Sequence, residues 1–369
     1  MKLLDVTPYF HTRSGGIRRY LLEKSKFLED TSIDHVLIIP GKENRVYYHR
    51  RTKVYEVSSF PIPMTGGYRF FLSYSGIKHI LEEEKPNVVE LGGTYQPIPT
   101  LKSDDYLLSV FYHSDIRSDL SLIPIPNRLK NVLTDYTITK RLSKAHIVIT
   151  PSKRQEEFLR NYKIENAVTV NLGVDTDVFN PSKRDPYFDR FLGIKEGTIK
   201  LLYVGRLSPE KNIGMLLNLV EHFDPTLFHF VLVGDGPLRE EVKRKASRIP
   251  NLTYLDFITG EEELAKVYAS CDIFVSTSPI ETYGLSFLEA QACGCLLVAF
   301  DMGLESQPFK DFLTEDYSLQ GFYRAVIKAC EAINLVTREQ VASLIRDRFS
   351  WRNTFERLLE VYSGLLAQV

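Results

Sequence analysis

Two carboxylates eight residues apart, Glu281 and Glu289, are the residues of this chain whose type and spacing best suit chemistry. They lie in Ser278-Pro-Ile-Glu281-Thr-Tyr-Gly284-Leu-Ser-Phe-Leu-Glu289, which predicts a strand end, a glycine-containing loop and a helix that begins near Leu285. Carboxylates accept hydrogen bonds from neighbouring hydroxyls, and the amino end of a helix offers backbone N–H groups and a positive dipole to an anion. A ligand with both features is a nucleotide sugar.

A second group of polar residues follows an apolar run upstream. Ile199-Lys-Leu-Leu-Tyr-Val204 predicts a buried strand, and Gly205, Arg206 and Lys211 come directly after it. A strand that ends in a glycine turn before a helix places these cations at the carboxyl edge of a parallel sheet, where open α/β sheets bind ligands. Arg206 and Lys211 are therefore expected to hold a diphosphate and to offset the charge on a leaving nucleoside diphosphate without a metal ion.

At these residues the chain resembles the retaining family-4 glycosyltransferases of the GT-B fold. The resemblance rests on a set of short motifs that extends over nearly the whole chain. Its members are Gly15-Gly16, His113, Ser152, Asn171-Leu-Gly173-Val-Asp175-Thr-Asp177-Val-Phe179, Gly205-Arg206 with Lys211, Gly234-Asp-Gly236-Pro, and Glu281 with Glu289. Each motif alone is weak, but together they occur in the order of the family.

The resemblance implies an α/β protein with two Rossmann-like domains that face each other across a cleft. The first, residues 1–180, would bind the acceptor, and the second, residues 181–349, would bind the nucleotide sugar. A last helix in residues 350–369 is expected to cross back to the first domain, although sequence does not separate this from a helix that packs on its own domain. Proline and charged residues near Asn180 place the linker there.

The resemblance also implies the site. Catalytic roles fall to His113, Glu281, Arg206 and Lys211, with His113 beside the donor sugar, Glu281 on the sugar hydroxyls and Glu289 on the ribose. The full set expected to bind the nucleotide sugar is Gly15, Gly16, Gly205, Arg206, Lys211, Gly234, Ile258, Glu281, Tyr283, Gly284, Leu285 and Glu289. Purely structural roles remain open for two of these sites, because His113 also fits a hydrogen-bonded structural histidine and Gly15-Gly16 also fits a simple turn.

The function that follows is transfer of a hexose from a UDP- or GDP-linked sugar to a hydroxyl of a glycan, lipid-linked or small-molecule acceptor, with retention at the anomeric carbon. Neither a cofactor nor a metal is expected, and Asp175-Thr-Asp177 is interpreted as a structural hinge segment. Met302-Gly303-Leu-Glu305 departs from the family's Gly-Gly-x-x-Glu turn. That departure keeps one alternative open, a catalytically idle relative that acts as a binding or scaffold subunit.

Composition agrees with a globular enzyme of about two domains. The chain has 369 residues, of which 44% are hydrophobic and 25% charged. Its 46 Lys and Arg against 47 Asp and Glu argue against a nucleic-acid-binding protein. Four cysteines in apolar settings are expected to be reduced, and no signal peptide or membrane-spanning run is evident, so a cytoplasmic location is expected.

Apolar runs alternate with helical patterns in both halves, as in parallel sheets covered on both faces. The expected strands are 3–6, 35–39, 53–57, 87–91, 107–111, 147–150, 168–171, 200–204, 229–233, 252–255, 273–276 and 296–299. For the acceptor side, the basic and aromatic stretch Arg45–Lys53 fits either an acceptor surface or a charged strand edge. The helix Ile17–Phe27 offers a second candidate surface, for peripheral contact with the inner face of a membrane.

Overall fold

The protein is described here from a computed structural model that covers residues 1–10, 15–61, 69–71, 74–94, 98–113, 116–117 and 126–367. The chain divides into two compact units, of which the first joins Met1–Leu172 to Trp351–Val369 and the second is Gly173–Ser350. The linker expected near Asn180 thus falls inside the second unit, where the Asn180 side chain caps a short 3-10 helix by accepting from Ser182 N at 3.1 Å.

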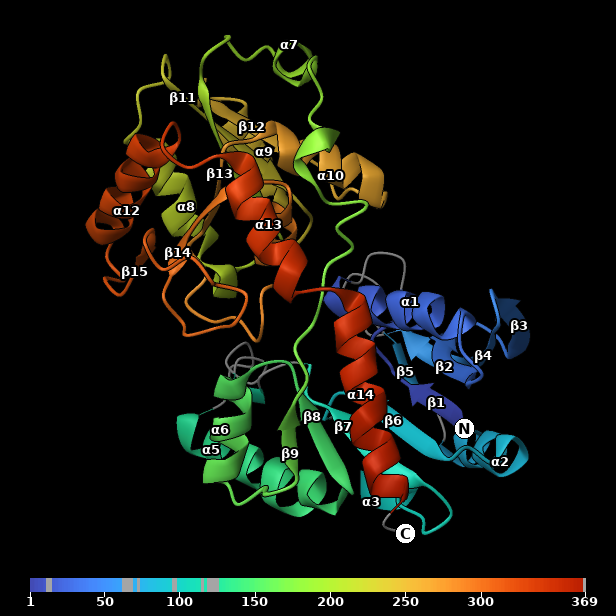
Figure 1. The fold of residues 1–369 in the computed structure, drawn as a ribbon. Coiled ribbons are helices and arrows are strands. Elements are labelled where there is room, and N and C mark those ends of the chain that lie inside the picture. The colour runs from blue at the N-terminus through green and yellow to red at the C-terminus, as the bar shows by residue number, and fades with distance from the viewer. Residues whose placement is uncertain are drawn as a thin grey trace. The chain divides into compact units, whose positions relative to one another are not determined.

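The first unit is built on one nine-stranded sheet in the order β3-β4-β2-β1-β6-β7-β8-β9, with β5 paired to β4 (Figure 1). Its strands are β1 (Lys2–Val6), β2 (Asp34–Gly41), β3 (Arg45–His49), β4 (Thr52–Pro61), β5 (Arg69–Phe71), β6 (Val88–Gly92), β7 (Leu107–Phe111), β8 (Ile147–Thr150) and β9 (Ala167–Thr169). Its helices are α1 (Gly16–Glu29), α2 (Tyr74–Glu84), α3 (Ile98–Leu101), α5 (Asn127–Tyr136), the π-helix η1 (Thr137–Arg141), the 3-10 helix η2 (Leu142–Lys144), α6 (Lys153–Asn161) and α14 (Trp351–Leu366).

The second unit has a six-stranded, fully parallel sheet in the order β12-β11-β10-β13-β14-β15. Its strands are β10 (Ile199–Val204), β11 (Phe228–Val233), β12 (Leu252–Leu255), β13 (Ile273–Ser276), β14 (Leu296–Phe300) and β15 (Leu313–Thr314). Its helices are η3 (Pro181–Lys183), α7 (Phe188–Leu192), η4 (Pro209–Lys211), α8 (Ile213–Val220), α9 (Arg239–Ala246), α10 (Glu261–Ser270), α11 (Leu285–Ala292), α12 (Leu319–Ala332) and α13 (Arg338–Arg348).

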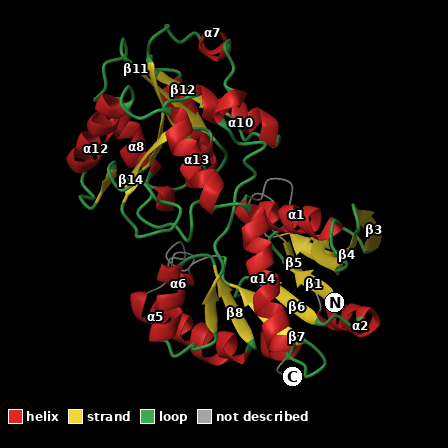
Figure 2. Ribbon diagram, in the orientation of Figure 1, coloured by secondary structure: helices red, strands yellow, loops and turns green. Residues whose placement is uncertain are grey.

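Within each unit, helices lie on both sides of the strands, as Figure 2 shows. The central strands are therefore buried on both faces, and Leu4, Val89 and Val110 of the first sheet and Leu201 and Phe230 of the second are 0% exposed. This burial explains why apolar runs without alternation mark these strands in the sequence. All twelve expected strands overlap observed ones, whereas β3, β5 and β15 were not predicted as strands.

The last helix, α14, packs within the first unit. The rings of Trp351 and Phe355 lie 6.4 and 5.5 Å from that of Tyr20 on α1, and Thr354 Oγ1 donates to Asn171 O at 2.8 Å. In Figure 1 α14 appears in red among the blue-to-green elements of this unit, although it is the last helix of the chain. Residues from the two ends of the sequence therefore share one core.

Candidate active site

The turn after β10 presents two cations at the carboxyl edge of the second sheet. Arg206 is exposed, and the structure, as far as it describes the chain, shows no carboxylate paired with its guanidinium. Lys211 ends η4, and its Nζ lies 2.6 Å from Glu281 Oε1. Asn212 follows with φ +54°, a left-handed conformation that opens α8, and its carbonyl accepts from Thr277 Oγ1 at 3.0 Å. This hydrogen bond joins the segments that follow β10 and β13, which are neighbouring strands of the parallel sheet.

Glu281 lies in the loop between β13 and α11. Ser278 Oγ donates to Ile280 O at 2.8 Å, and Ser306 Oγ donates to the carbonyl of Tyr283, so this loop is held at both ends. Gly284 has φ +81° and directly precedes the first turn of α11, where the backbone N–H groups have no partner within the helix. The loop therefore brings a carboxylate and a helix amino end to the same strand edge.

Glu289 occupies a different position from Glu281. Its side chain, on α11, is only 8% exposed, and Tyr268 OH of α10 donates to its Oε2 at 2.9 Å. The structure thus brings Lys211 and Glu281 into contact, whereas Glu289 accepts a hydrogen bond from a tyrosine. The contact with a ribose that the family resemblance implies for Glu289 stays a prediction.

Glycines allow the turn after β11 to pack directly on the turn after β10. A Cβ at Gly234 would lie 2.0 Å from Gly205 O, and one at Gly236 would lie 2.4 Å from Leu207 O. Leu207 N donates to Asp235 O at 2.9 Å, so the two turns are also joined by their backbones. Gly205 and Gly234 are therefore neighbours. Ile258 is half-buried in the loop after β12, and it lies at the same edge of the sheet because β12 runs parallel to β11.

The segment Met302–Glu305, which departs from the family pattern, is fixed by hydrogen bonds. Gln307 accepts from Met302 N at 3.1 Å and donates to Phe300 O at 2.7 Å, while Gln291 of α11 donates to Ser306 O at 2.9 Å. The loop after β14 is consequently fastened to α11 and, through Ser306, to the Glu281 loop. Sequence reasoning did not single out Ser306 or Gln307, because a single polar residue in a loop gives no pattern.

His113 follows β7 in the first unit. Its ring stacks on Phe111 at 4.1 Å between centroids and meets the edge of Tyr20 at 5.4 Å. Burial lowers the pKa of His113 to about 3, and the nearby positive charge of Lys24 adds to this against the opposing charge of Asp5. The imidazole is therefore neutral near pH 7 and is suited to hydrogen bonding rather than to carrying a charge.

Gly15 and Gly16 stand at the amino end of α1. Gly15 precedes the helix without a side-chain cap, and a Cβ on it would meet no atom within 4 Å. The contact of this backbone with a phosphate stays a prediction. The preceding residues Thr12, Arg13 and Ser14 lie outside the described part of the chain.

A buried charge cluster lies beneath this end of α1, and sequence reasoning missed it. Lys24 Nζ, 1% exposed, lies 2.9 Å from Asp5 Oδ1 and 3.3 Å from Glu90 Oε2. Tyr20 OH donates to Glu90 Oε1 at 3.0 Å, and Tyr362 OH of α14 also donates to this carboxylate. The available signal was a carboxylate inside each of two otherwise apolar central strands, β1 and β6. Lys24 and Tyr20 are buried and so do not contribute to the membrane-facing surface expected of the helix Ile17–Phe27, which otherwise stays a prediction.

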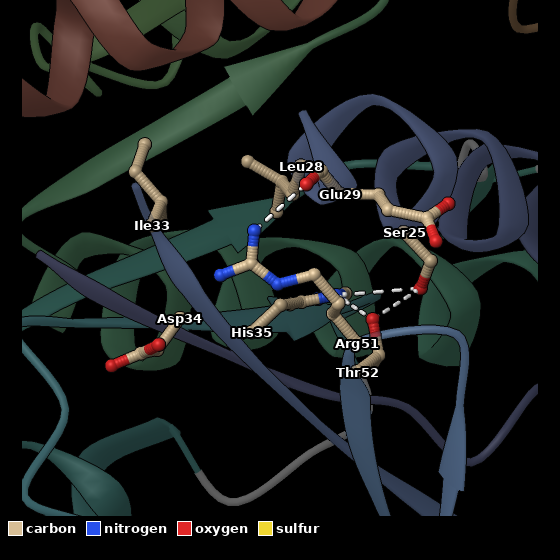
Figure 3. A pocket seen from close by; sticks show the side chains of 8 residues that line it. All are labelled: Ser25, Leu28, Glu29, Ile33, Asp34, His35, Arg51 and Thr52. Carbon is tan, nitrogen blue, oxygen red and sulfur yellow. Dashed lines mark hydrogen bonds between the residues drawn. The ribbon is translucent and has the colours of Figure 1, made fainter. Parts of the chain in front are cut away.

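His35 connects this cluster to a small pocket at the other end of α1 (Figure 3). Its Nε2 lies 2.6 Å from Asp5 Oδ2, while its Nδ1 lies 2.8 Å from Thr52 Oγ1 and 3.4 Å from Ser25 Oγ. The order Ser, His and Asp resembles a hydrolase triad, but Ser25 is 2% exposed and also bonds Thr52 Oγ1 at 2.8 Å. These groups satisfy one another and form part of the core.

Asp175 caps the turn that contains Asp177. Asp175 Oδ1 accepts from the backbone N–H groups of Asp177 and Val178 at 3.1 and 3.3 Å, which is a turn cap. Within the described ranges, no group of three or more His, Cys, Asp or Glu side chains is placed to hold a metal ion. None of the described helices is both long and apolar enough to span a bilayer.

The arrangement can be compared with known proteins. Residues 14–178 match the sequence profile described as Glycosyltransferase Family 4, and residues 198–332 match that described as Glycosyl transferases group 1. The chain belongs to the family-4 glycosyltransferases. The two matched segments lie one in each half of this glycosyltransferase and include His113 in the first and Arg206, Lys211, Glu281 and Glu289 in the second.

Curated relatives of this glycosyltransferase include two mannosyltransferases. The GDP-mannose-dependent alpha-(1-6)-phosphatidylinositol dimannoside mannosyltransferase of Mycobacterium tuberculosis is 28% identical over 301 residues, 80% of this chain and 78% of the relative. The GDP-mannose-dependent alpha-mannosyltransferase of Corynebacterium glutamicum is 24% identical over 314 residues, 80% of this chain and 71% of the relative.

Solved structures show the same fold. A sucrose-phosphate synthase from Thermosynechococcus elongatus superposes with a TM-score of 0.83 at 15% identity and covers 100% of both chains. The Anabaena protein HepE in complex with UDP-glucose gives a TM-score of 0.75 at 17% identity, over 99% of this chain and 100% of that one. The predicted GT-B fold is confirmed, as is the assignment as a glycosyltransferase.

Proposed function

We propose that this glycosyltransferase moves a hexose from a nucleoside diphosphate sugar to an acceptor hydroxyl, with retention at the anomeric carbon and without a metal ion. The observation that carries the proposal is the 2.6 Å contact between Lys211 Nζ and Glu281 Oε1 at the strand edge that also carries the exposed Arg206, which pairs with no carboxylate among the described residues. Cations suit a diphosphate and a carboxylate suits sugar hydroxyls, so one strand edge offers partners to both halves of the donor.

The ion pair between Lys211 and Glu281 is compatible with binding of a donor. The side chains of Lys211 and Glu281 are 24% and 17% exposed, so each holds the other in place yet remains reachable. On donor binding, Lys211 and Arg206 would donate to the diphosphate, and Glu281 would accept from sugar hydroxyls. The N–H groups at Tyr283 to Leu285 and at Gly16 would complete the phosphate contacts, with Gly205 and Gly234 allowing the backbone close to the nucleotide.

Retention is proposed to proceed on one face of the sugar. The bond from the anomeric carbon to the leaving phosphate oxygen breaks, the bond to the acceptor oxygen forms on the same side, and the acceptor's proton passes to the departing phosphate. Arg206 and Lys211 would stabilise the negative charge that develops there. His113, with a pKa of about 3, is a poor base near pH 7 and is assigned to orienting the sugar by a hydrogen bond.

The names of the relatives guide the choice of donor and acceptor. Two are GDP-mannose-dependent mannosyltransferases, and one solved structure holds UDP-glucose. GDP-mannose is therefore the donor to test first, with UDP-glucose next. A glycan or a lipid-linked alcohol is the proposed acceptor, bound by the first unit. We also propose a cytoplasmic location, with which four free cysteines, three of them buried, are compatible.

Calorimetric titration in EDTA tests the donor site. The wild-type protein is titrated with UDP, GDP, ADP and their sugar conjugates, beside Glu281→Ala and the control Glu262→Ala. Glu262 pairs with Lys183 at 2.8 Å on the surface of the same unit, so the control breaks an ion pair of similar length away from the strand edge. We expect one nucleotide to bind without metal and only Glu281→Ala to lose the added affinity of the sugar.

Product analysis then separates an enzyme from an idle relative. Incubation of the preferred donor with a mannoside acceptor, followed by measurement of the anomeric configuration by NMR, is expected to show the configuration of the donor. An inverted product would overturn retention. Folded protein that binds no nucleotide would overturn the donor site and favour the scaffold alternative.

A further inference from the structure

The helix α5 turns an apolar face outward. Leu129, Val132, Leu133 and Tyr136 occur at positions i, i+3, i+4 and i+7, which lie on one side of a helix, and they are 45, 59, 37 and 57% exposed. Four large apolar side chains in one exposed stripe are unusual for a helix on a water-soluble surface. Figure 1 shows α5 at the outer edge of the first unit.

The opposite side of the same helical segment is anchored in the core. Thr134 is buried, and Ile138 and Leu142, one and two turns further along η1 and η2, are 0% exposed and belong to the core of the first unit. The orientation of α5 is therefore set by its own buried side. The outward stripe remains exposed after these core contacts are made, so packing among the described residues does not account for it.

Charge around this stripe is mostly positive. Residues 127–144 contain five basic residues, Arg128, Lys130, Lys140, Arg141 and Lys144, and a single acidic one, Asp135. Among the described residues, Arg128, Lys140 and Lys144 are exposed and form no ion pair. A stripe of apolar side chains with cations along it is complementary to an anionic lipid surface, where the apolar groups enter the bilayer and the cations meet headgroups.

We propose that the α5 face, defined as Leu129, Val132, Leu133 and Tyr136 with Arg128, Lys140 and Lys144, docks this glycosyltransferase on an anionic membrane surface. A second copy of the chain is a poorer occupant, because a symmetric contact would bring two such positive faces together. The proposal goes beyond the proposed transfer reaction but serves it, since a lipid-linked acceptor would be met at that surface.

The other exposed aromatic surface of the first unit fits a membrane less well. Val46 and Tyr48 on the edge strand β3 are 52 and 68% exposed. Their neighbouring cations are already paired, Arg45 with Glu56, and Arg50 with Glu29 at 2.5 Å. This hairpin therefore matches the alternative of a charged strand edge, and its positive charge is largely neutralised.

Vesicle binding tests the α5 face. The full-length protein is sedimented with vesicles of phosphatidylcholine alone or with about 30 mol% phosphatidylglycerol, at low and high salt. We expect binding to the anionic vesicles only, weakened by salt. The double variant V132E/Y136E should lower the partition coefficient at least about tenfold, and K140E/K144E should lower it by a similar factor.

A matched control is available in the second unit. Tyr187 and Phe191 are also four residues apart and are 69 and 82% exposed, so Y187E/F191E places the same charges on an equally exposed apolar pair. Wild-type binding is expected for this control. Nucleotide titration without vesicles, on the same samples, shows whether each variant is folded and keeps the donor site apart from the membrane question.

Three results would overturn the proposal. They are a wild-type protein that binds neither kind of vesicle, an equal loss in the Y187E/F191E control, and a concentration-dependent dimer in light scattering that V132E/Y136E abolishes. The last would assign the α5 face to a second copy of the chain. None of these results bears on the donor site, and failure of nucleotide binding would leave the vesicle result intact.

Discussion

Burial decides the protonation of His113. Because burial lowers its pKa to about 3, the folded protein keeps this imidazole neutral while the unfolded chain binds a proton below about pH 6.5. This group therefore costs stability as the pH falls from about 6.5 towards 3. His35 acts in the same direction, since burial lowers its pKa as well.

The first prediction concerns His113 as a possible base. We expect its imidazole nitrogen shifts, measured by long-range ¹H–¹⁵N NMR, to stay constant between about pH 5 and 8, where an ordinary histidine titrates. The exposed His49 and His79 provide reference signals in the same spectra. A midpoint near neutrality for His113 would contradict the orienting role and restore a general base.

The contribution of Glu90 to stability changes with pH in the opposite direction. Burial and the neighbouring Asp5 raise its pKa to about 7, against the effect of Lys24, from an ordinary value of 4.5. The folded protein thus binds a proton that the unfolded chain releases above 4.5, and the stability gained is lost as the pH rises through about 7.

The second prediction is that Glu90→Gln removes this pH dependence. The difference in unfolding free energy between wild type and Glu90→Gln, from urea titrations, should change in favour of the variant between about pH 4.5 and 7. The exposed Glu82→Gln on α2 serves as the control for removing a carboxylate from the surface of the same unit. A flat difference for Glu90→Gln would mean that Lys24 keeps Glu90 ionised throughout.

At the scale of single elements, the start of α11 depends on Gly284. It has φ +81°, and a Cβ there would lie 2.7 Å from Phe287 Cδ2. Gly197, between α7 and β10, has φ +82° with no atom within 4 Å of such a Cβ. The two glycines therefore share a backbone conformation but differ in contacts and in distance along the sheet from the site.

The third prediction compares alanine at these positions. Each substitution should cost about 1–2 kcal/mol, the usual cost of a left-handed conformation for a residue with a Cβ. Only Gly284→Ala should also weaken nucleotide binding, by roughly tenfold, because the clash with Phe287 moves the helix amino end. Equal nucleotide affinity of both variants, measured by calorimetry, would separate α11 from the donor site.

For the whole molecule, the single tryptophan offers a probe of one unit. The chain has one Trp, and Trp351 lies 6% exposed in the first unit, against Phe355 and Tyr20. The residues proposed to bind the diphosphate, by contrast, lie mainly in the second unit. A ligand stabilises the part of a protein that binds it in the folded state.

The fourth prediction is that saturating nucleotide shifts thermal unfolding unevenly. The transition followed by Trp351 fluorescence should move little, while that followed by far-UV circular dichroism should acquire a component at higher temperature. Urea unfolding without ligand provides the reference for each probe. An equal shift of both signals would show that the two units unfold as one cooperative body.

The sequence by itself determined the positions of the central strands and the order of the motifs. A strand buried on both faces is mostly apolar, and the predicted ranges Leu3–Val6, Leu107–Phe111 and Lys200–Val204 agree with the observed strands to within one residue. The turn residues Gly205, Arg206 and Lys211 and the carboxylate Glu281 then follow, since strand ends of a parallel sheet meet at one edge.

Only the tertiary structure decided which charged residues are buried and which groups they contact. Lys24 reads as a surface cation in the helix Ile17–Phe27, but the register of α1 against β1 and β6 places it between Asp5 and Glu90. On α5, Ile138 and Leu142 of the following turns occupy the core contacts and leave Val132 and Tyr136 exposed. Local sequence states which residues are apolar or charged, whereas partners distant in the chain decide which of them are buried.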